Sequence, residues 1–258
     1  MGNPAETLKE SSCLKIENCA VGINALEMRS FELNALIRDL VKREFKEFNL
    51  HNVYGQRYIG AGLSGNITFK VYGTPGNDLG IFMNGLNIYV YGNVEDGCGN
   101  TMNDGLIAVY GQAGDITGYS MRGGKIFIRG DVGYRAGIHM KGYQTVPALV
   151  IGGCAGDFLG EYMAGGMILL LRLNEGRQHE TRFTGTGMHG GVIYVRGKIT
   201  HLGEGAKTSD TDENDLQVIR NLVEQFCNLF NFNFSEIIKQ EFTKIVPVSH
   251  RPYGRLYT

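Results

Sequence analysis

The stretch Gly80-Ile81-Phe82-Met83-Asn84-Gly85 leads into a short β-rich run, Leu86–Tyr91, which ends at Gly92. The same pattern returns along the chain. Its methionine recurs with spacings of 19, 19, 19, 23 and 25 residues, at Met83, Met102, Met121, Met140, Met163 and Met188. A glycine lies three residues before each methionine, and another lies two residues after it, except at Asp104, where Gly105 follows at once. The chain is therefore an internal repeat, and the repeat decides the fold.

The β-rich runs that follow the repeated glycines alternate apolar and polar residues. With an earlier copy there are seven of them: Asn66–Tyr72, Leu86–Tyr91, Leu106–Tyr110, Lys125–Arg129, Ala148–Ile151, Met167–Leu171 and Val192–Arg196. Pairs such as Ile88/Val90 and Ile126/Ile128 occupy alternate positions, so each run is a strand with one face turned inward.

A strand that returns every 19 residues leaves too little chain for a crossover helix, since a βαβ unit takes roughly 30 residues. The repeat therefore predicts a mainly β, single-stranded parallel β-helix of about seven coils. The methionine and Ile/Val columns stack inside it, and glycines form the corners. The two longer repeats carry inserts near Gln144–Pro147 and between Asn174 and Thr184, which we expect to bulge outward.

Amphipathic segments flank the repeat. Helical spacing of apolar residues predicts helices over Ser30–Phe48 and Asp210–Phe230, and a third from Ser235 that uses Ile237, Ile238 and Phe242. A β-helix has open strand edges at both ends, so these N- and C-terminal helices are interpreted as caps or as docking surfaces for partners. The expected domains are residues 1–55, the β-helix at 56–203, and a C-terminal helical cap and tail at 204–258.

Composition narrows the class of protein. The net charge of −1 provides no field that would recruit nucleic acid or an anionic membrane. No apolar run approaches the roughly 20 residues of a membrane span, and the N-terminus has no secretion signal, so the cytosol is the expected compartment. Five cysteines without a CxxC pair indicate thiols in a reducing compartment rather than a disulfide framework.

Two stretches match the dinucleotide-binding pattern GxGxxG, at Gly60–Gly65 and Gly185–Gly190. A dinucleotide loop follows a strand and opens a helix, whereas each of these leads into a strand, so they are interpreted as coil corners. Gly205-Ala206-Lys207-Thr208 weakly resembles a phosphate loop but lacks its first glycine and its Gly-Lys pair.

Other side chains with chemical potential also have simple structural interpretations. His139 and His189 each adjoin a repeat methionine but do not recur with acidic or cysteine partners, so a metal site is not favoured. Cys98 and Cys154 have no matched His-Asp pair. A polysaccharide-cleaving β-helix would need clustered carboxylates, and the available ones lie mostly in loops: Asp78, Asp96, Asp115, Asp131 and Asp157. The mildly basic tail, with His250, Arg251 and Arg255, is interpreted as solvated or partner-contacting. No catalytic, cofactor-binding or metal-binding residue is predicted.

The repeated Gly-x-x-Met-x-Gly followed by a strand and a glycine resembles the GXGXG repeat domain of glutamate synthase. Matching segments are Arg29–Asn34, Gly55–Gly62, Leu63-Ser64-Gly65 and Gly160–Gly166, and the resemblance covers most of the chain, about Ala25 to Lys198. That domain lies at the C-terminus of the large subunit, or forms a separate chain in some archaea and bacteria. One subunit of formylmethanofuran dehydrogenase carries a similar coil.

The resemblance implies a right-handed parallel β-helix in an enzyme that makes glutamate from glutamine and 2-oxoglutarate. In that family the catalytic cysteine, FMN, iron–sulfur cluster and NADPH belong to other domains, and the β-helix bridges and orients them. Position 1 here is Met followed by Gly2, not a nucleophilic cysteine, so no catalytic residue is carried over. The expected function is a non-catalytic structural subunit, with glutaminase and FMN/iron–sulfur synthase partners and with self-association left open. Two alternatives also stay open: the equivalent subunit of a formylmethanofuran dehydrogenase or another oxidoreductase, and an independent carbohydrate-active β-helix enzyme.

Overall fold

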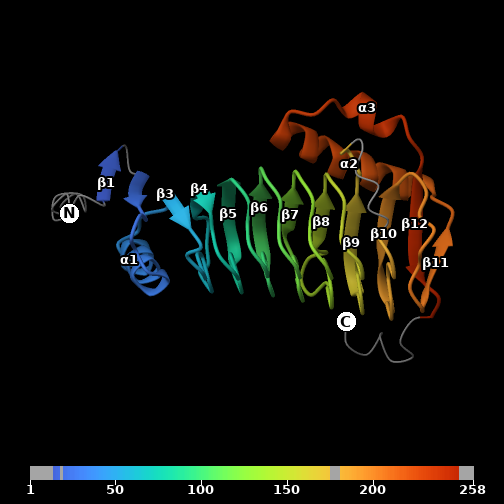
Figure 1. Cartoon of the computed structure of the whole chain (residues 1–258), viewed down its shortest axis with the longest axis horizontal. Helices are drawn as coiled ribbons and strands as arrows, with labels where there is room; N and C mark the ends of the chain where they lie inside the picture. The colour runs from blue at the N-terminus through green and yellow to red at the C-terminus, as the bar shows by residue number, and fades with distance from the viewer. Residues whose placement is uncertain (1–13, 18–19, 175–180, 250–258) are drawn as a thin grey trace.

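The computed structural model describes residues 14–17, 20–174 and 181–249. Twelve strands form one continuous sheet in the order β1 to β10, then β12 and β11 (Figure 1). The strands are β1 (Leu14–Glu17), β2 (Ala20–Asn24), β3 (Glu47–Tyr54), β4 (Thr68–Thr74), β5 (Asn84–Tyr91), β6 (Asp104–Val109), β7 (Lys125–Ile128), β8 (Ala148–Ile151), β9 (Ala164–Leu170), β10 (Gly190–Arg196), β11 (Ala206–Ser209) and β12 (Phe242–Pro247). The helices are α1 (Ser30–Lys42), α2 (Glu213–Phe230) and α3 (Phe234–Ile238).

The predicted parallel β-helix is confirmed. Strands β4 to β10 are the seven predicted runs, each pairs in parallel with the next, and six full turns join them, slightly fewer than the coil count expected. The apolar column is in register: Phe69 lies opposite Ile88, Ile88 opposite Ile107, and Ile107 opposite Ile126. The parallel stack also extends upstream of residue 56, because β2 and β3 continue it.

The methionine column lies inside the coil, as predicted. Five of the six repeat methionines are fully buried and Met188 is 3% exposed. In the first copy Leu63 takes the methionine position, three residues after Gly60. The flexible methionine side chain can fill irregular gaps in a core, which suits a position that recurs at the same corner of each coil. This column belongs to the core, as the repeat predicts.

Each corner holds alternate residues in the left-handed region. In one coil Ile116, Gly118 and Ser120 have φ of 51°, 73° and 51°. Their amides donate alternately to the next and the previous coil: Ile116 to the Tyr134 carbonyl (2.8 Å), Gly118 to that of Cys98 (2.8 Å) and Ser120 to that of Ile138 (2.9 Å). Bonds on both sides of the coil hold a conformation that is costly for a β-branched residue such as Ile116.

The N-terminal helix is shorter than predicted. Leu33, Ile37 and Leu40 of α1 join the main core, but the helix ends at Lys42 rather than Phe48. The chain turns at Glu44, whose φ is 71°. Phe48 then enters β3 and stacks on Phe69, with ring centroids 5.0 Å apart. Phe48, the last apolar residue of the helical pattern, therefore lies in a strand.

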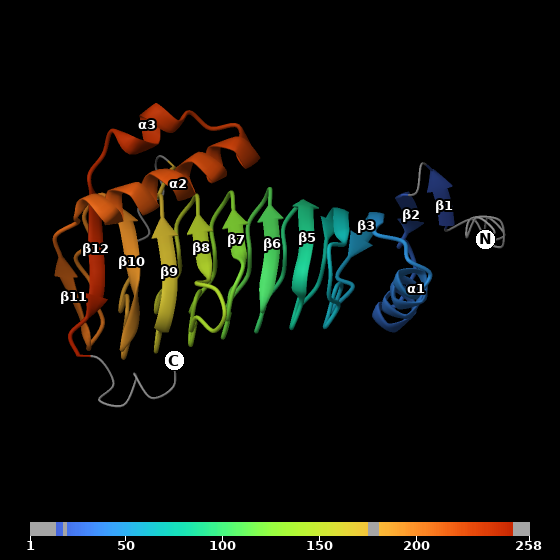
Figure 2. The same ribbon diagram turned by 180° about the vertical axis from the view of Figure 1, so that it is seen from behind.

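The C-terminal helix α2 lies along the side of the sheet rather than across its end (Figures 1 and 2). Its apolar stripe, including Ile219, Val223 and Phe226, forms a second core with residues of β6 to β10. The end of the β-helix is covered instead by β12, which is antiparallel to β10, and by β11 beyond it. Phe242 begins β12 and is not part of the third helix that the spacing predicts.

The first insert bulges outward, as predicted: Tyr143 is 81% exposed and Val146 is 61% exposed. The second insert lies largely outside the described residues. Within the described ranges, no helix has the length and apolar character needed to cross a membrane.

Candidate functional site

The loop aspartates are used to join coils. Each accepts at least one hydrogen bond from the following coil: Asp78 from the Asn100 amide group (2.9 Å), Asp96 from the Asp115 backbone N–H (2.8 Å), Asp115 from that of Tyr134 (2.8 Å), Asp131 from that of Cys154 (2.8 Å), and Asp157 from that of Arg182 (3.0 Å). A carboxylate oxygen that accepts a backbone N–H is a strong, directional contact. These side chains make contacts between adjacent coils.

Replacing Asp115 by alanine should destabilise the protein by about 0.5–1.5 kcal/mol, because the Tyr134 N–H loses its carboxylate acceptor at an exposed position. Asp115→Asn keeps an oxygen at the same place and is the matched control, with an expected loss below about 0.5 kcal/mol. Urea unfolding monitored by circular dichroism measures both. Equal losses for the two variants would show that the contact with Tyr134 is unimportant.

The two histidines do not meet as a metal site. His139 is exposed, has a φ of 56°, and its ring stacks on Tyr162 with centroids 5.4 Å apart. His189 places Nδ1 3.1 Å from the Gly187 carbonyl oxygen. Among the residues that the structure describes, no group of three or more His, Cys, Asp or Glu side chains could hold a metal ion.

The glycine motifs are structural as well. Gly60, Gly62, Gly185 and Gly187 all have positive φ at coil corners, and the chain continues from each motif into a strand. Gly205 directly precedes β11, and residues 206–208 belong to that strand. This segment therefore leads into a strand and does not open a helix as a phosphate loop does.

The buried thiols are unsuited to nucleophilic chemistry. Cys98 is fully buried in the main core, and burial raises the pKa of its thiol to about 12. Burial also raises the pKa of the thiol of Cys227, which is one of the buried residues of α2. Since the thiolate is the nucleophile, neither group is activated at neutral pH.

A polar network that the sequence pattern did not reveal holds α2 in place. The Asp215 carboxylate accepts hydrogen bonds from the Tyr194 hydroxyl (2.5 Å) and the Lys244 ammonium (2.6 Å). It also closes the N-terminal capping box of α2 with Asp212. Burial raises the pKa of the Tyr194 hydroxyl, so this phenol stays protonated and acts as a donor. The three side chains come from β10, α2 and β12, which is why no local motif predicts them.

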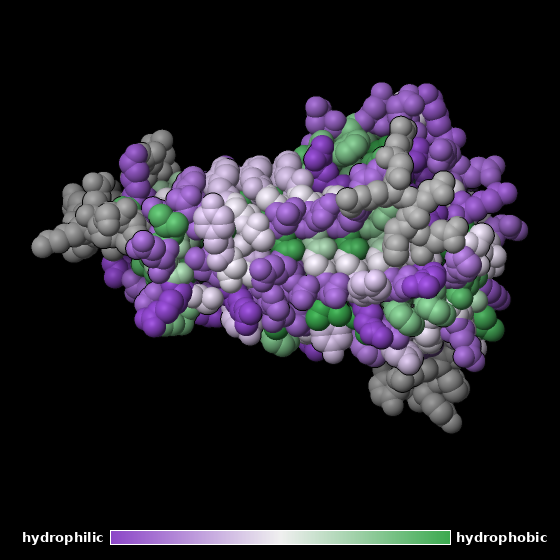
Figure 3. Space-filling model, in the orientation of Figure 1, coloured by the Kyte–Doolittle hydropathy of each residue, from purple (hydrophilic) through white to green (hydrophobic). Residues whose placement is uncertain are grey.

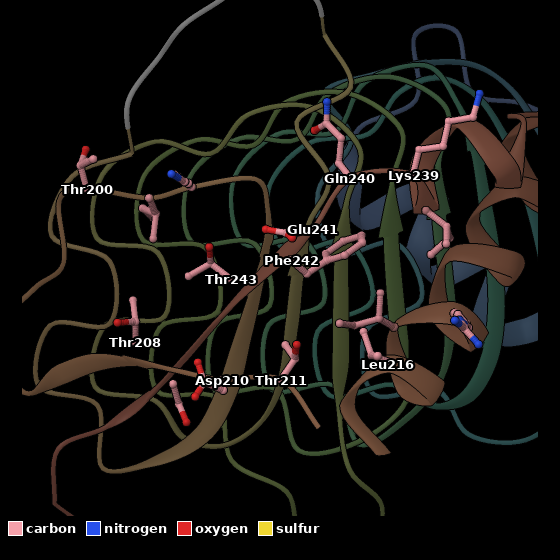
Figure 4. Close-up of a pocket in the computed structure, with 16 residues that line it drawn as sticks. Thr200, Thr208, Asp210, Thr211, Leu216, Lys239, Gln240, Glu241, Phe242 and Thr243 are labelled. Carbon is pink, nitrogen blue, oxygen red and sulfur yellow. The ribbon is translucent and has the colours of Figure 1, made fainter. Parts of the chain in front are cut away.

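An open pocket of about 1020 Å³ lies between β12, α2, α3 and the segment 198–200. Its charged lining mixes Lys198, Arg220 and Lys239 with Asp210 and Glu241. The labelled side chains are spread widely around it and do not converge on one point (Figure 4). Lys239 is already paired with Glu236 at 2.5 Å. The mixed charges of the pocket lining do not favour one class of ligand.

The outer face of the sheet has two halves. Over β6 to β10 it is apolar and covered by α2, while over β3 to β5 α2 does not reach it (Figure 1). The rings of His51, Tyr72, Tyr91 and Tyr110 stack in a row across the open half, and the row ends at Tyr110, which directly follows β6. Neighbouring centroids are 4.8 to 4.9 Å apart. We call these four residues the aromatic ladder. It is the candidate interaction surface, because Tyr72 and Tyr91 are 37% and 40% exposed.

The architecture defines a parallel β-helix protein whose coils turn at glycine-rich corners. The chain belongs to the GXGXG motif family, whose model matches residues 41–250. It is 48% identical over 251 residues to the uncharacterised protein MJ1350 of Methanocaldococcus jannaschii, covering 92% of this chain and 96% of that protein. Membership of the GXGXG motif family, which the repeat led us to expect, is therefore confirmed.

Proposed function

We propose that this chain is a non-catalytic structural subunit of a glutamate-synthase-like oxidoreductase complex in the cytosol. It bridges and orients the glutaminase part and the FMN- and iron–sulfur-containing synthase part, which make glutamate from glutamine and 2-oxoglutarate. FMN, the cluster and NADPH are held by those partner subunits. The observation that carries the proposal is the GXGXG family match over residues 41–250.

The use of the side chains supports a structural role. Carboxylates that could act as acids or bases accept hydrogen bonds between coils, as at Asp96 and Asp115. The Cys98 thiol is buried and the methionines form the core. A stack of in-register coils is a stiff spacer, since every turn is bonded to the turns on both sides.

The test is affinity purification of the tagged full-length chain from its native cells, followed by mass spectrometry and an absorption spectrum. We expect glutaminase-like and flavin-containing synthase chains to co-purify, with a flavin spectrum that stays with the partner after separation. Molybdenum- or tungsten-containing subunits would instead identify the dehydrogenase alternative. Recovery of the chain without partners, or glycan turnover by the isolated chain, would refute the proposal.

A further inference from the structure

The outer face of the sheet changes composition where α2 ends. One outward column in register runs Asn49, Lys70, Tyr89 over β3 to β5 and then Ala108, Phe127, Val150, Leu169, Tyr194 over β6 to β10. The second part supplies the small and apolar side chains that α2 buries. The first part has larger, partly polar side chains: Tyr89 packs at the border of the α2 core, Asn49 is half-buried, and Lys70 is exposed.

Parallel sheets are normally covered on both faces. Here α2 covers only the later strands and stops at Phe230, followed by Asn231 in the left-handed conformation. Figure 3 shows a pale surface, of intermediate hydropathy, beside the end of α2. Tyrosine-rich surfaces of this kind are typical of the cores of protein–protein interfaces, because each ring is large, rigid and has a polar end.

The end of α2 shows how a helix meets the aromatic ladder. The Phe230 ring packs edge-on against Tyr110, with centroids 5.0 Å apart and an interplanar angle of 84°. Tyr110 also contacts Tyr91, so the covered and uncovered halves are one continuous surface. Burial raises the pKa of the Tyr110 hydroxyl, whereas Tyr72 and Tyr91 stay open to contact.

We propose that an amphipathic helix of the flavin-containing partner subunit docks across β3 to β5, in line with α2, and extends its layer over the aromatic ladder. This inference rests on the proposed function and names the surface that performs it. Three strands about 4.8 Å apart are spanned by a helix of about three turns. The fitting helix presents apolar or aromatic side chains to Tyr72 and Tyr91, as α2 presents Phe230 to Tyr110, and a carboxylate to the exposed Lys70.

The test compares three full-length proteins: the wild type, the double variant Tyr72→Glu/Tyr91→Glu, and the control Tyr143→Glu. The control makes the same tyrosine-to-glutamate change on the outward insert, where the Tyr143 side chain is 81% exposed. The binding probe is the flavin-containing subunit that the wild type captures from native cells, purified and titrated against each immobilised chain. We expect the double variant to lose affinity by about 100-fold and the control to bind as the wild type does.

Hydroxyl-radical footprinting of the wild-type complex gives a measurement that does not depend on a variant. Oxidation of Tyr72 and Tyr91 should fall when the subunit binds, while that of Tyr143 should not change. Unchanged oxidation of Tyr72 and Tyr91, or wild-type affinity of a folded double variant, would overturn the docking site and leave the proposed function standing. If no version of the chain captures a glutamate-synthase subunit, the proposed function itself fails. Protection of Tyr72 that appears with chain concentration alone would show that a second copy occupies the face, and would also overturn the proposal.

Discussion

Replacing Gly105 by alanine should destabilise the protein by about 3–5 kcal/mol, because two costs add. Gly105 enters β6 with a φ of 110°, which L side chains rarely adopt. An added Cβ would lie 2.3 Å from the Leu86 carbonyl oxygen and 2.8 Å from the Leu86 nitrogen, and both are backbone atoms of the neighbouring coil. The stacked turns would have to separate to make room. Urea unfolding followed by circular dichroism measures the loss.

The matched control is Gly62→Ala. Gly62 is also a corner glycine with a positive φ, 63°, but an added Cβ there meets nothing within 4 Å. Only the left-handed conformation is penalised, by about 1–2 kcal/mol. Equal losses of stability for the two variants would mean that the close approach of adjacent coils at Gly105 does not limit the size of this side chain.

Replacing Asp215 by alanine should cost about 3–5 kcal/mol, because it leaves the Lys244 ammonium without its carboxylate in a mostly buried position. It also removes the acceptor of the Tyr194 hydroxyl and one half of the α2 capping box. We expect α2 to loosen from β10 and β12, seen as a lower urea midpoint and faster hydrogen exchange in α2. The control is Glu236→Ala, whose pair with Lys239 is exposed at 62% and 66%, and which should change stability by less than about 1 kcal/mol.

The same network predicts an acid dependence. Burial tends to raise the pKa of Asp215, but the hydrogen bonds from Lys244 and Tyr194 outweigh it and hold the pKa below its usual value. A carboxyl with a lowered folded pKa contributes stability above its unfolded pKa of about 4 and loses it as pH falls through the folded value. The wild type should therefore lose more stability than Asp215→Ala between about pH 5 and the folded pKa. Parallel acid dependence of the two proteins would contradict this role for Asp215.

Much of the fold could be predicted because the repeat is written in residue spacing. With a period of 19 residues, Met102 occupies the same place in its coil as Met83 does in the coil before. The period-two alternation separates the inner column of side chains from the outer one. Both patterns are local, so they survive without knowledge of contacts. The seven strands and the buried methionines follow from them directly.

Other features could not be predicted, because long-range contacts decide them. Ile116 and Thr101 adopt positive φ against their own preference, held by bonds to the adjacent coils. Phe48 has helical spacing but is taken into β3 by stacking on Phe69. The amphipathic pattern of α2 shows that one side is buried, but not that it lies against the side of the sheet.

The candidate site follows the same division. Neither Asp96 nor His139 belongs to a motif that would predict catalysis from the sequence. In the structure Asp96 accepts a hydrogen bond from the next coil. The aromatic ladder was missed, although Tyr72, Tyr91 and Tyr110 recur at the repeat interval of 19 residues. That recurrence at the end of successive strands was the available signal. What the spacing could not show is which half of the face α2 leaves open.

We propose that this β-helix holds catalytic subunits in place and performs no chemistry itself. The most direct test is a structure of the complex purified from native cells. We predict that the flavin and the iron–sulfur cluster lie wholly in partner chains, and that a partner helix covers Tyr72 and Tyr91. A flavin or cluster bound by this chain's own residues, or an aromatic ladder facing solvent in the assembled complex, would contradict it.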